Sequence, residues 1–102
     1  MHRFLLASVL ILCTVFTGCF AQSGYEPIDI NTFTSRRIML VAAEHIGVEL
    51  TREISAFKKI DEPWYIVNFE GSHPSGWTWT CTAKVHEPSI GRGYVVWWRC
   101  RF

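Results

Sequence analysis

Residues 77–86 have the sequence WTWTCTAKVH, in which apolar and polar side chains alternate without a break. This period of two is typical of a β-strand that presents one face to a hydrophobic core and the other to water. Residues 94–102, YVVWWRCRF, follow after a loop with one proline and two glycines, residues 87–93. The two runs therefore predict an antiparallel hairpin.

Each run of this hairpin contains one cysteine, Cys81 and Cys100. If the two cysteines face each other, the same register makes three further pairs: Ala83 with Trp98, Val85 with Val96, and Lys84 with Trp97. The side chains of the second run then divide into a buried set and an outward set. The buried set is Tyr94, Val96, Trp98, Cys100 and Phe102, and the outward set is Val95, Trp97, Arg99 and Arg101. We expect one disulfide, Cys81–Cys100, on the buried face.

The preceding residues supply the remaining elements. Residues 36–46 have helical apolar spacing, with Thr34 or Ser35 as the cap and Gly47 at the end. This spacing places His45 on the apolar face. Residues 48–56 alternate, with Ile54 on the inner side and Arg52 as the exception. Residues 64–70 are apolar on both sides, as in a central strand, and residues 24–34 are either a short strand or an extended arm. The pattern predicts an α+β fold, one helix packed on a four-stranded antiparallel sheet.

The first 21 residues have the pattern of a signal peptide. Arg3 precedes an apolar run, residues 4–16, that is too short to span a bilayer, and small residues precede a cleavage point after Ala21. Residues 22–102 then form a single secreted domain, and only the pair Cys81 and Cys100 remains in it. An alternative is a bacterial lipidation site at Cys19.

Composition excludes some classes of function. Residues 22–102 contain nine Lys or Arg and nine Asp or Glu, so the mature chain is formally neutral and does not indicate nucleic-acid binding. The last hairpin is nevertheless locally basic and aromatic. Trp and Arg are the residue types that most often supply binding energy at interfaces. The candidates for partner binding are therefore Trp97, Val95, Arg99, Arg101, Lys84 and Arg92.

No catalytic, metal or cofactor site is expected. Acid and base pairs could be drawn from Glu70 with His73 and from His86 with Glu87, but their spacing does not require them to converge. The histidines and cysteines show no spacing typical of metal ligands. Arg36 and Arg37 form either a dibasic processing site or a solvated pair at the start of the helix. The second interpretation is favoured because the following residues complete the helix.

A helix followed by an antiparallel sheet, behind this signal peptide, resembles the small secreted effectors of plant-pathogenic fungi. These include the biotrophy-associated secreted proteins of rice blast and the ribonuclease-like effectors of cereal powdery mildews. The resemblance rests on Tyr25, the helix at residues 36–46 with its paired alanines, the later strands, and Cys100 near the end. It implies a non-catalytic virulence protein that binds a host protein, in host tissue or host cytoplasm, and promotes infection.

Two further resemblances imply other functions. A disulfide-closed hairpin rich in aromatic and basic residues is similar to crustacean anti-lipopolysaccharide factors, which implies a secreted antimicrobial or envelope-binding protein that contacts membranes. A helix wrapped by an antiparallel sheet with a disulfide in the final hairpin is similar to cystatins, with Gly24 as their N-terminal glycine. Residues 50–59 lack the glutamine-to-glycine motif and residues 87–93 lack the Pro-Trp pair of those protease inhibitors. The effector is the first prediction, the envelope-binding protein the second and the cystatin-like inhibitor the third.

Overall fold

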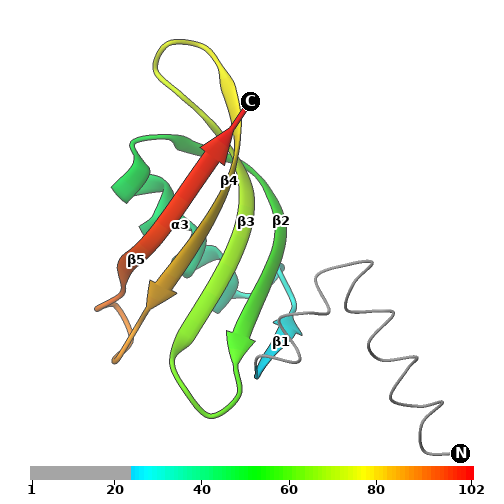
Figure 1. Cartoon of the computed structure of the whole chain (residues 1–102), viewed down its shortest axis with the longest axis vertical. Coiled ribbons are helices and arrows are strands. Elements are labelled where there is room, and N and C mark those ends of the chain that lie inside the picture. The colour runs from blue at the N-terminus through cyan, green and yellow to red at the C-terminus, as the bar shows by residue number, and fades with distance from the viewer. Residues whose placement is uncertain (1–23) are drawn as a thin grey trace, which may run out of the picture.

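The computed structural model describes residues 24–102, which form one helix and five strands (Figure 1). The predicted signal peptide, residues 1–21, lies outside the described residues. The elements, in chain order, are β1 (Tyr25–Ile28), α3 (Phe33–Ile46), β2 (Glu49–Lys59), β3 (Trp64–Ser72), β4 (Thr78–His86) and β5 (Tyr94–Arg101).

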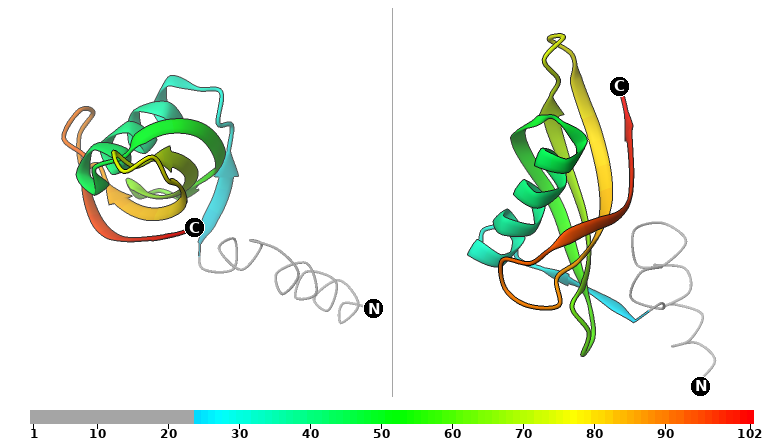
Figure 2. Two further views of the ribbon diagram at one scale, coloured as in Figure 1. Left: turned by 90° about the horizontal axis from the view of Figure 1, so that it is seen from above. Right: turned by 90° about the vertical axis from the view of Figure 1, so that its left-hand side faces the viewer.

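The five strands form a single antiparallel sheet in the order β1-β2-β3-β4-β5, so each strand pairs with its neighbour along the chain. The sheet curves around α3, which lies on its concave face, as Figure 2 shows. We call this the inner face and the opposite one the outer face. The α+β class is confirmed, but the predicted count of four strands is wrong because residues 25–28 also pair with β2. This strand is short and contains Pro27, so its local sequence does not distinguish it from an extended arm.

The helix begins earlier than the apolar spacing predicted. Thr32 is the N-cap, and its hydroxyl accepts a hydrogen bond of 3.2 Å from the backbone N–H of Ser35. Ser35, one of the two caps that the sequence predicted, lies within the helix, is fully buried and donates to the carbonyl of Asp29 at 2.7 Å. The predicted end is confirmed: Gly47 has φ 90° and donates to the Ala43 carbonyl at 2.9 Å. His45 is exposed, so its expected place on the apolar face is wrong.

β2 is irregular, and this changes the orientation of its side chains. The register shifts once between Leu50 and Arg52 and again between Glu53 and Ser55, so the strand contains two extra residues, Thr51 and Ile54. The first extra residue, Thr51, explains why Arg52, the exception in the sequence pattern, faces outward opposite Glu70. The second, Ile54, is 36% exposed, so its predicted place on the inner face is wrong.

The final hairpin has the predicted register over most of its length. Cys81 lies opposite Cys100, Ala83 opposite Trp98 and Lys84 opposite Trp97. The expected Val85–Val96 pair is wrong: a register shift between Lys84 and Val85 places Val85 opposite Val95. Val96 is therefore the extra residue of a bulge in β5. Val95 turns inward and packs against the core, although the alternation placed it outside.

The core lies between α3 and the inner face of the sheet. The largest side chains that are fully buried in it come from α3, β3 and β4, and they are Ile38, Met39, Val67, Phe69, Cys81 and Val85, with the small Ser35. A second, smaller cluster on the outer face joins Tyr25, Phe57, Ile66 and Trp64. The sheet is therefore partly covered on both faces near β1, whereas its other end, near β5, presents apolar side chains to solvent.

Candidate functional site

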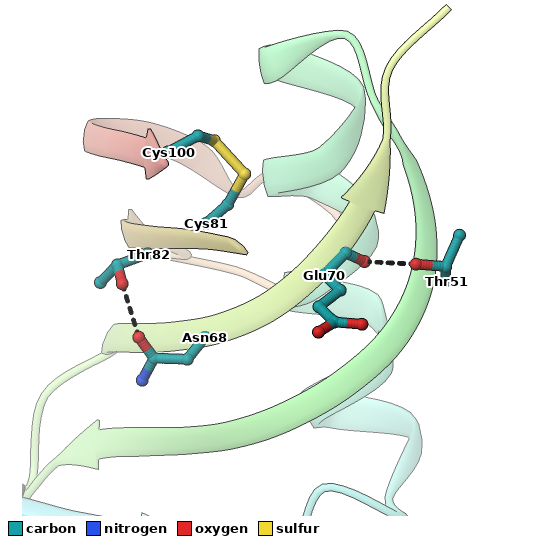
Figure 3. Close-up of a disulfide and its surroundings, with 6 residues drawn as sticks. All are labelled: Thr51, Asn68, Glu70, Cys81, Thr82 and Cys100. Atoms are coloured by element: carbon teal, nitrogen blue, oxygen red, sulfur yellow. Dashed lines mark hydrogen bonds between the residues drawn. A yellow bond between two sulfur atoms is a disulfide. The ribbon is translucent and has the colours of Figure 1, made fainter. Parts of the chain in front are cut away.

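The disulfide fixes the two strands on which most of the predicted binding residues lie. Cys81 and Cys100 form a bond of 2.01 Å with 4.1 Å between their Cα atoms, and Cys81 is fully buried. Figure 3 shows the disulfide on one side of the sheet and the side chains of Thr82 and Asn68 on the other. The predicted disulfide is confirmed, and the outer face of β4 and β5 is held in register by the bond beneath it.

Four of the six predicted binding residues share that outer face. The register places Lys84 beside Trp97, Thr82 beside Arg99, and Thr80 beside Arg101. The Arg99 guanidinium lies 5.7 Å from the centre of the Trp97 ring, within cation–π range. The Lys84 ammonium lies 5.1 Å from the centre of the Trp64 ring. The outer face of the hairpin therefore combines tryptophan and cationic side chains.

The other two candidates, Val95 and Arg92, lie elsewhere. Arg92 is exposed in the loop between β4 and β5. Val95 lines a cavity of about 720 Å³ between α3 and β5, together with Phe33 and Leu40. Phe33 is 90% exposed and Leu40 is 46% exposed. The structure thus separates Val95 and Arg92 from the other four candidates.

The most exposed apolar stretch of the sheet is on β5, and sequence alternation did not predict its extent. Val96, Trp97 and Trp98 are 49%, 48% and 42% exposed, although they are consecutive. A regular strand would turn every second residue inward. The bulge at Val96 and the position of β5 at the edge of the sheet leave all three in contact with solvent. A run of apolar residues within the tail was visible in the sequence, but the bulge was not.

A cluster of aromatic rings lies at the end of the sheet near the C-terminus. His73 stacks on Trp79 with 4.5 Å between ring centres, and Phe102 contacts both Trp77 and Trp79 edge to face. Trp77 is 63% exposed and Phe102 84% exposed, so the alternation placed both in the core wrongly. The Trp79 Nε1 atom is buried and has no hydrogen-bond acceptor among residues 24–102.

The residues considered for acid and base chemistry do not form one site. Glu70 is opposite Thr80, and Trp64 is opposite His86. His86 lies six positions after Thr80 along β4, which is a span of about 20 Å. His73 bonds Ser75 at 2.7 Å, and His86 stacks on Trp64 at 4.2 Å. Arg52 donates to Glu70 at 2.8 Å and lowers the pKa of that carboxyl.

Glu87 is engaged in a different way, because its carboxylate is buried. Arg37 donates to both of its oxygens, Nε at 2.8 Å and a terminal nitrogen at 2.7 Å, and the Gly91 N–H donates at 3.4 Å. The guanidinium lowers the pKa of Glu87 and the carboxylate raises the pKa of Arg37. Burial raises the pKa of the neighbouring Tyr65, and Glu87 adds to this effect. Both carboxylate oxygens of Glu87 therefore already accept hydrogen bonds that hold the fold together.

The two arginines considered as a processing site lie within the helix and are both in ion pairs. Arg36 contacts Glu53 at 3.1 Å at the surface, and Arg37 contacts Glu87 at 2.7 Å. A protease that cleaves after a dibasic pair would need this first half of α3 to unwind. The placement favours the structural interpretation of the pair.

Within residues 24–102, no group of three or more His, Cys, Asp or Glu side chains is placed to hold a metal ion. Over the same residues no helix has the length and apolar character needed to cross a membrane. Comparison of the chain with protein-family models, with curated proteins and with solved structures gave no match.

Proposed function

We propose that this chain is a small secreted protein without enzymatic activity that acts by binding another protein through β5. The observation that carries the proposal is the succession of three half-exposed apolar residues, Val96, Trp97 and Trp98, on an edge strand. Monomeric proteins rarely expose several large apolar residues side by side, and such a patch marks an interaction surface. The disulfide between β4 and β5 keeps this surface preformed, which lowers the entropy cost of binding.

The composition of the surface suits a protein partner. Trp97 has Arg99 against its ring, and tryptophan and arginine are the residues most enriched at the centre of protein interfaces. The sequence resemblance to fungal effectors supplies the setting, in which the partner is a host protein and binding promotes infection. The formal neutrality of the mature chain agrees with a protein partner better than with an anionic membrane.

The experiment is affinity capture from plant leaf extract, followed by direct binding to each captured protein after purification. The bait is the oxidised secreted protein, with Trp97→Ala and Leu40→Ala as matched variants. Leu40 and Trp97 are almost equally exposed, but Leu40 lies on α3. Loss of a hot-spot tryptophan should weaken direct binding about 30-fold, and Leu40→Ala should change it less than about twofold.

Two results would contradict the proposal. Equal weakening by both variants would show that binding depends on exposed apolar area in general. Leakage of dye from anionic liposomes, reduced by Trp97→Ala, in the absence of any protein partner would favour the envelope-binding alternative instead.

Inhibition of papain-like proteases, third among the functions predicted from the sequence, is the second candidate here because the strand order favours it. Cystatins, which the sequence resembles, act through their N-terminal segment and two loops. Here Gly24, the turn after β2 and the loop after β4 lie at one end of the sheet. The Ile60 N–H donates to the Gly24 carbonyl at 2.7 Å, and the Glu87 N–H donates to the Pro63 carbonyl at 2.9 Å.

This end also presents two exposed apolar side chains, Ile60 at 50% and Ile90 at 83% exposure. The test is titration of papain with the oxidised protein and with Ile90→Ser. Stoichiometric inhibition that the variant weakens would support the second candidate. Full papain activity at a large excess of the protein would remove it.

A further inference from the structure

The outer face of the sheet has a polar groove that borders the proposed protein-binding surface and shares Arg99 with it. It encloses about 360 Å³ across β2, β3, β4 and β5. Its polar lining residues are Ser55, Asn68, Thr80, Thr82, Arg99 and Arg101. Hydroxyl and amide groups therefore form its floor, and two arginines stand on the side of β5.

Strand pairing aligns these residues into two rows that cross the sheet. Ser55 is opposite Asn68, Asn68 opposite Thr82, and Thr82 opposite Arg99. In the next row, each residue is again opposite the following one: Arg52, Glu70, Thr80 and Arg101. β2 contains two extra residues, one before Arg52 and one after Glu53. Together they set the alignment that places Ser55 opposite Asn68, in the first row.

Hydrogen bonds fix the first row and leave donors available. Thr82 Oγ1 donates to Asn68 Oδ1 at 2.6 Å, and Asn68 Nδ2 donates to Ser55 Oγ at 2.9 Å. Figure 3 shows the Thr82 and Asn68 side chains pointing toward each other on the outer side of the sheet. Because Ser55 Oγ accepts in this bond, its own hydroxyl hydrogen can still be donated to a ligand. The Thr80 hydroxyl has no hydrogen bond within residues 24–102.

The charge of the groove is positive. Arg99 and Arg101 are two residues apart on one face of β5, a spacing of about 7 Å. No acidic side chain among the described residues forms an ion pair with either arginine. The one carboxylate in the two rows, Glu70, is already paired with Arg52 at 2.8 Å. A ligand that complements this groove carries negative charge.

We propose that the groove binds an acidic oligosaccharide, a chain of uronic acid sugars. Each sugar ring presents hydroxyl groups that donate and accept hydrogen bonds, as the serine, threonine and asparagine side chains of the floor do. Its carboxylate is planar and accepts two parallel hydrogen bonds from a guanidinium. An acidic peptide fits less well, because the backbone groups of β3 and β4 beneath the groove are already paired within the sheet.

The experiment measures binding of a galacturonic acid hexamer to the oxidised secreted protein by calorimetry. The matched ligand is the same hexamer with its carboxylates methyl-esterified, and a hexamer of glutamate tests for simple charge attraction. We expect the ester and the glutamate peptide to bind about tenfold more weakly than the acid form.

Variants then locate the site. The double variant Arg99→Gln/Arg101→Gln should weaken binding of the hexamer at least about tenfold, since two charge-assisted contacts are lost. Arg92→Gln, which removes an exposed arginine outside the groove, should change it less than about twofold. Ser55→Ala should weaken the saccharide several-fold and leave binding of the glutamate peptide unchanged.

Three results would overturn the proposal: unaltered binding by the double variant, equal affinity for the acid and its ester, or equal affinity for the glutamate peptide. Thermal unfolding of each variant checks that the protein remains folded. The inference does not depend on the proposed protein partner. Leu40→Ala and Trp97→Ala test that partner separately, outside the groove.

Discussion

Arg37 and Glu87 are 50 residues apart in the sequence and form a bidentate ion pair between α3 and the loop after β4. The Glu87 side chain is 3% exposed and that of Arg37 is 29% exposed. The backbone N–H of the same glutamate bonds the Pro63 carbonyl in the turn between β2 and β3. One residue thus connects the helix, the turn and the loop at the end of the sheet where the second candidate function would act.

The pair should make stability depend on pH. Because the folded-state pKa of Glu87 is lowered by Arg37, its contribution to stability is present above the pKa of an unfolded glutamate, about 4.3, and is lost as pH falls through the folded value. Melting temperature against pH for the protein and for Glu87→Gln should therefore converge in acid. Glu70→Gln is the control, because its pKa is lowered in the same direction but the pair is exposed. A curve for Glu87→Gln parallel to that of the unmodified protein would refute the prediction.

Removing Arg37 alone should lower the free energy of unfolding more than removing the charges of both Arg37 and Glu87. Arg37→Met leaves the buried Glu87 carboxylate without its partner, and we expect a loss of roughly 3 kcal/mol in the free energy of unfolding. Arg37→Met/Glu87→Gln should lose less than Arg37→Met alone. Urea denaturation of the three variants measures this, and strict additivity would contradict the coupling.

The disulfide should contribute strongly to stability. Its cysteines are 19 residues apart, and closing a loop of this length contributes about 3 kcal/mol in the chain-entropy model. The double variant Cys81→Ala/Cys100→Ala should lower the urea midpoint accordingly, with an added loss from the buried Cys81 side chain. Reduction of the unmodified protein gives the contribution of the bond alone, and an unchanged midpoint after reduction would contradict it.

Gly71 should not tolerate a side chain. A Cβ atom at this position would lie 2.5 Å from Val48 Cγ2 and 2.8 Å from Val48 Cβ. Gly71→Ala should therefore cost about 1–3 kcal/mol, the usual range for overpacking. Val48→Ala in the same chain should recover part of this loss, although it also removes buried apolar area. Chemical denaturation of the single and double variants tests the contact, and purely additive losses would show that Val48 is not the obstacle.

The helix cap can be tested against the position that the sequence suggested. Thr32→Ala removes the hydroxyl that accepts from the Ser35 N–H and should cost about 1 kcal/mol. Thr34→Ala, which changes one of the two caps first predicted, should cost a few tenths or less, because Thr34 lies within the helix. The opposite order of melting temperatures would place the helix start at residue 35.

Much of the fold was predictable where local pattern and tertiary environment agree. The alternation of residues 77–86 identified β4, and the paired cysteines set its register with β5. Gly47 marked the end of the helix because few other residues adopt its backbone angles at low cost. β1 was left open because four residues around Pro27 form a strand only when β2 is present beside them.

The candidate site was predicted in part. Lys84, Trp97, Arg99 and Arg101 share a face because a register fixed near the cysteines extends to them without interruption. Val95 lies beyond the bulge, and the period of two places it on the wrong side. The polar groove was not predicted, because Ser55 and Asn68 come from strands whose alignment depends on the two irregularities in β2.

The sequence by itself determined the period of each main element and the one cysteine pair in residues 22–102, because these depend on neighbours along the chain and on the count of thiols. Only the tertiary structure decided the bulge at Val96, the pair of Arg37 with Glu87 and the rows on the outer face. Each of these depends on contacts between strands or between helix and loop. Such contacts are set by how the whole sheet curves around α3, and a pattern within one segment does not contain that information.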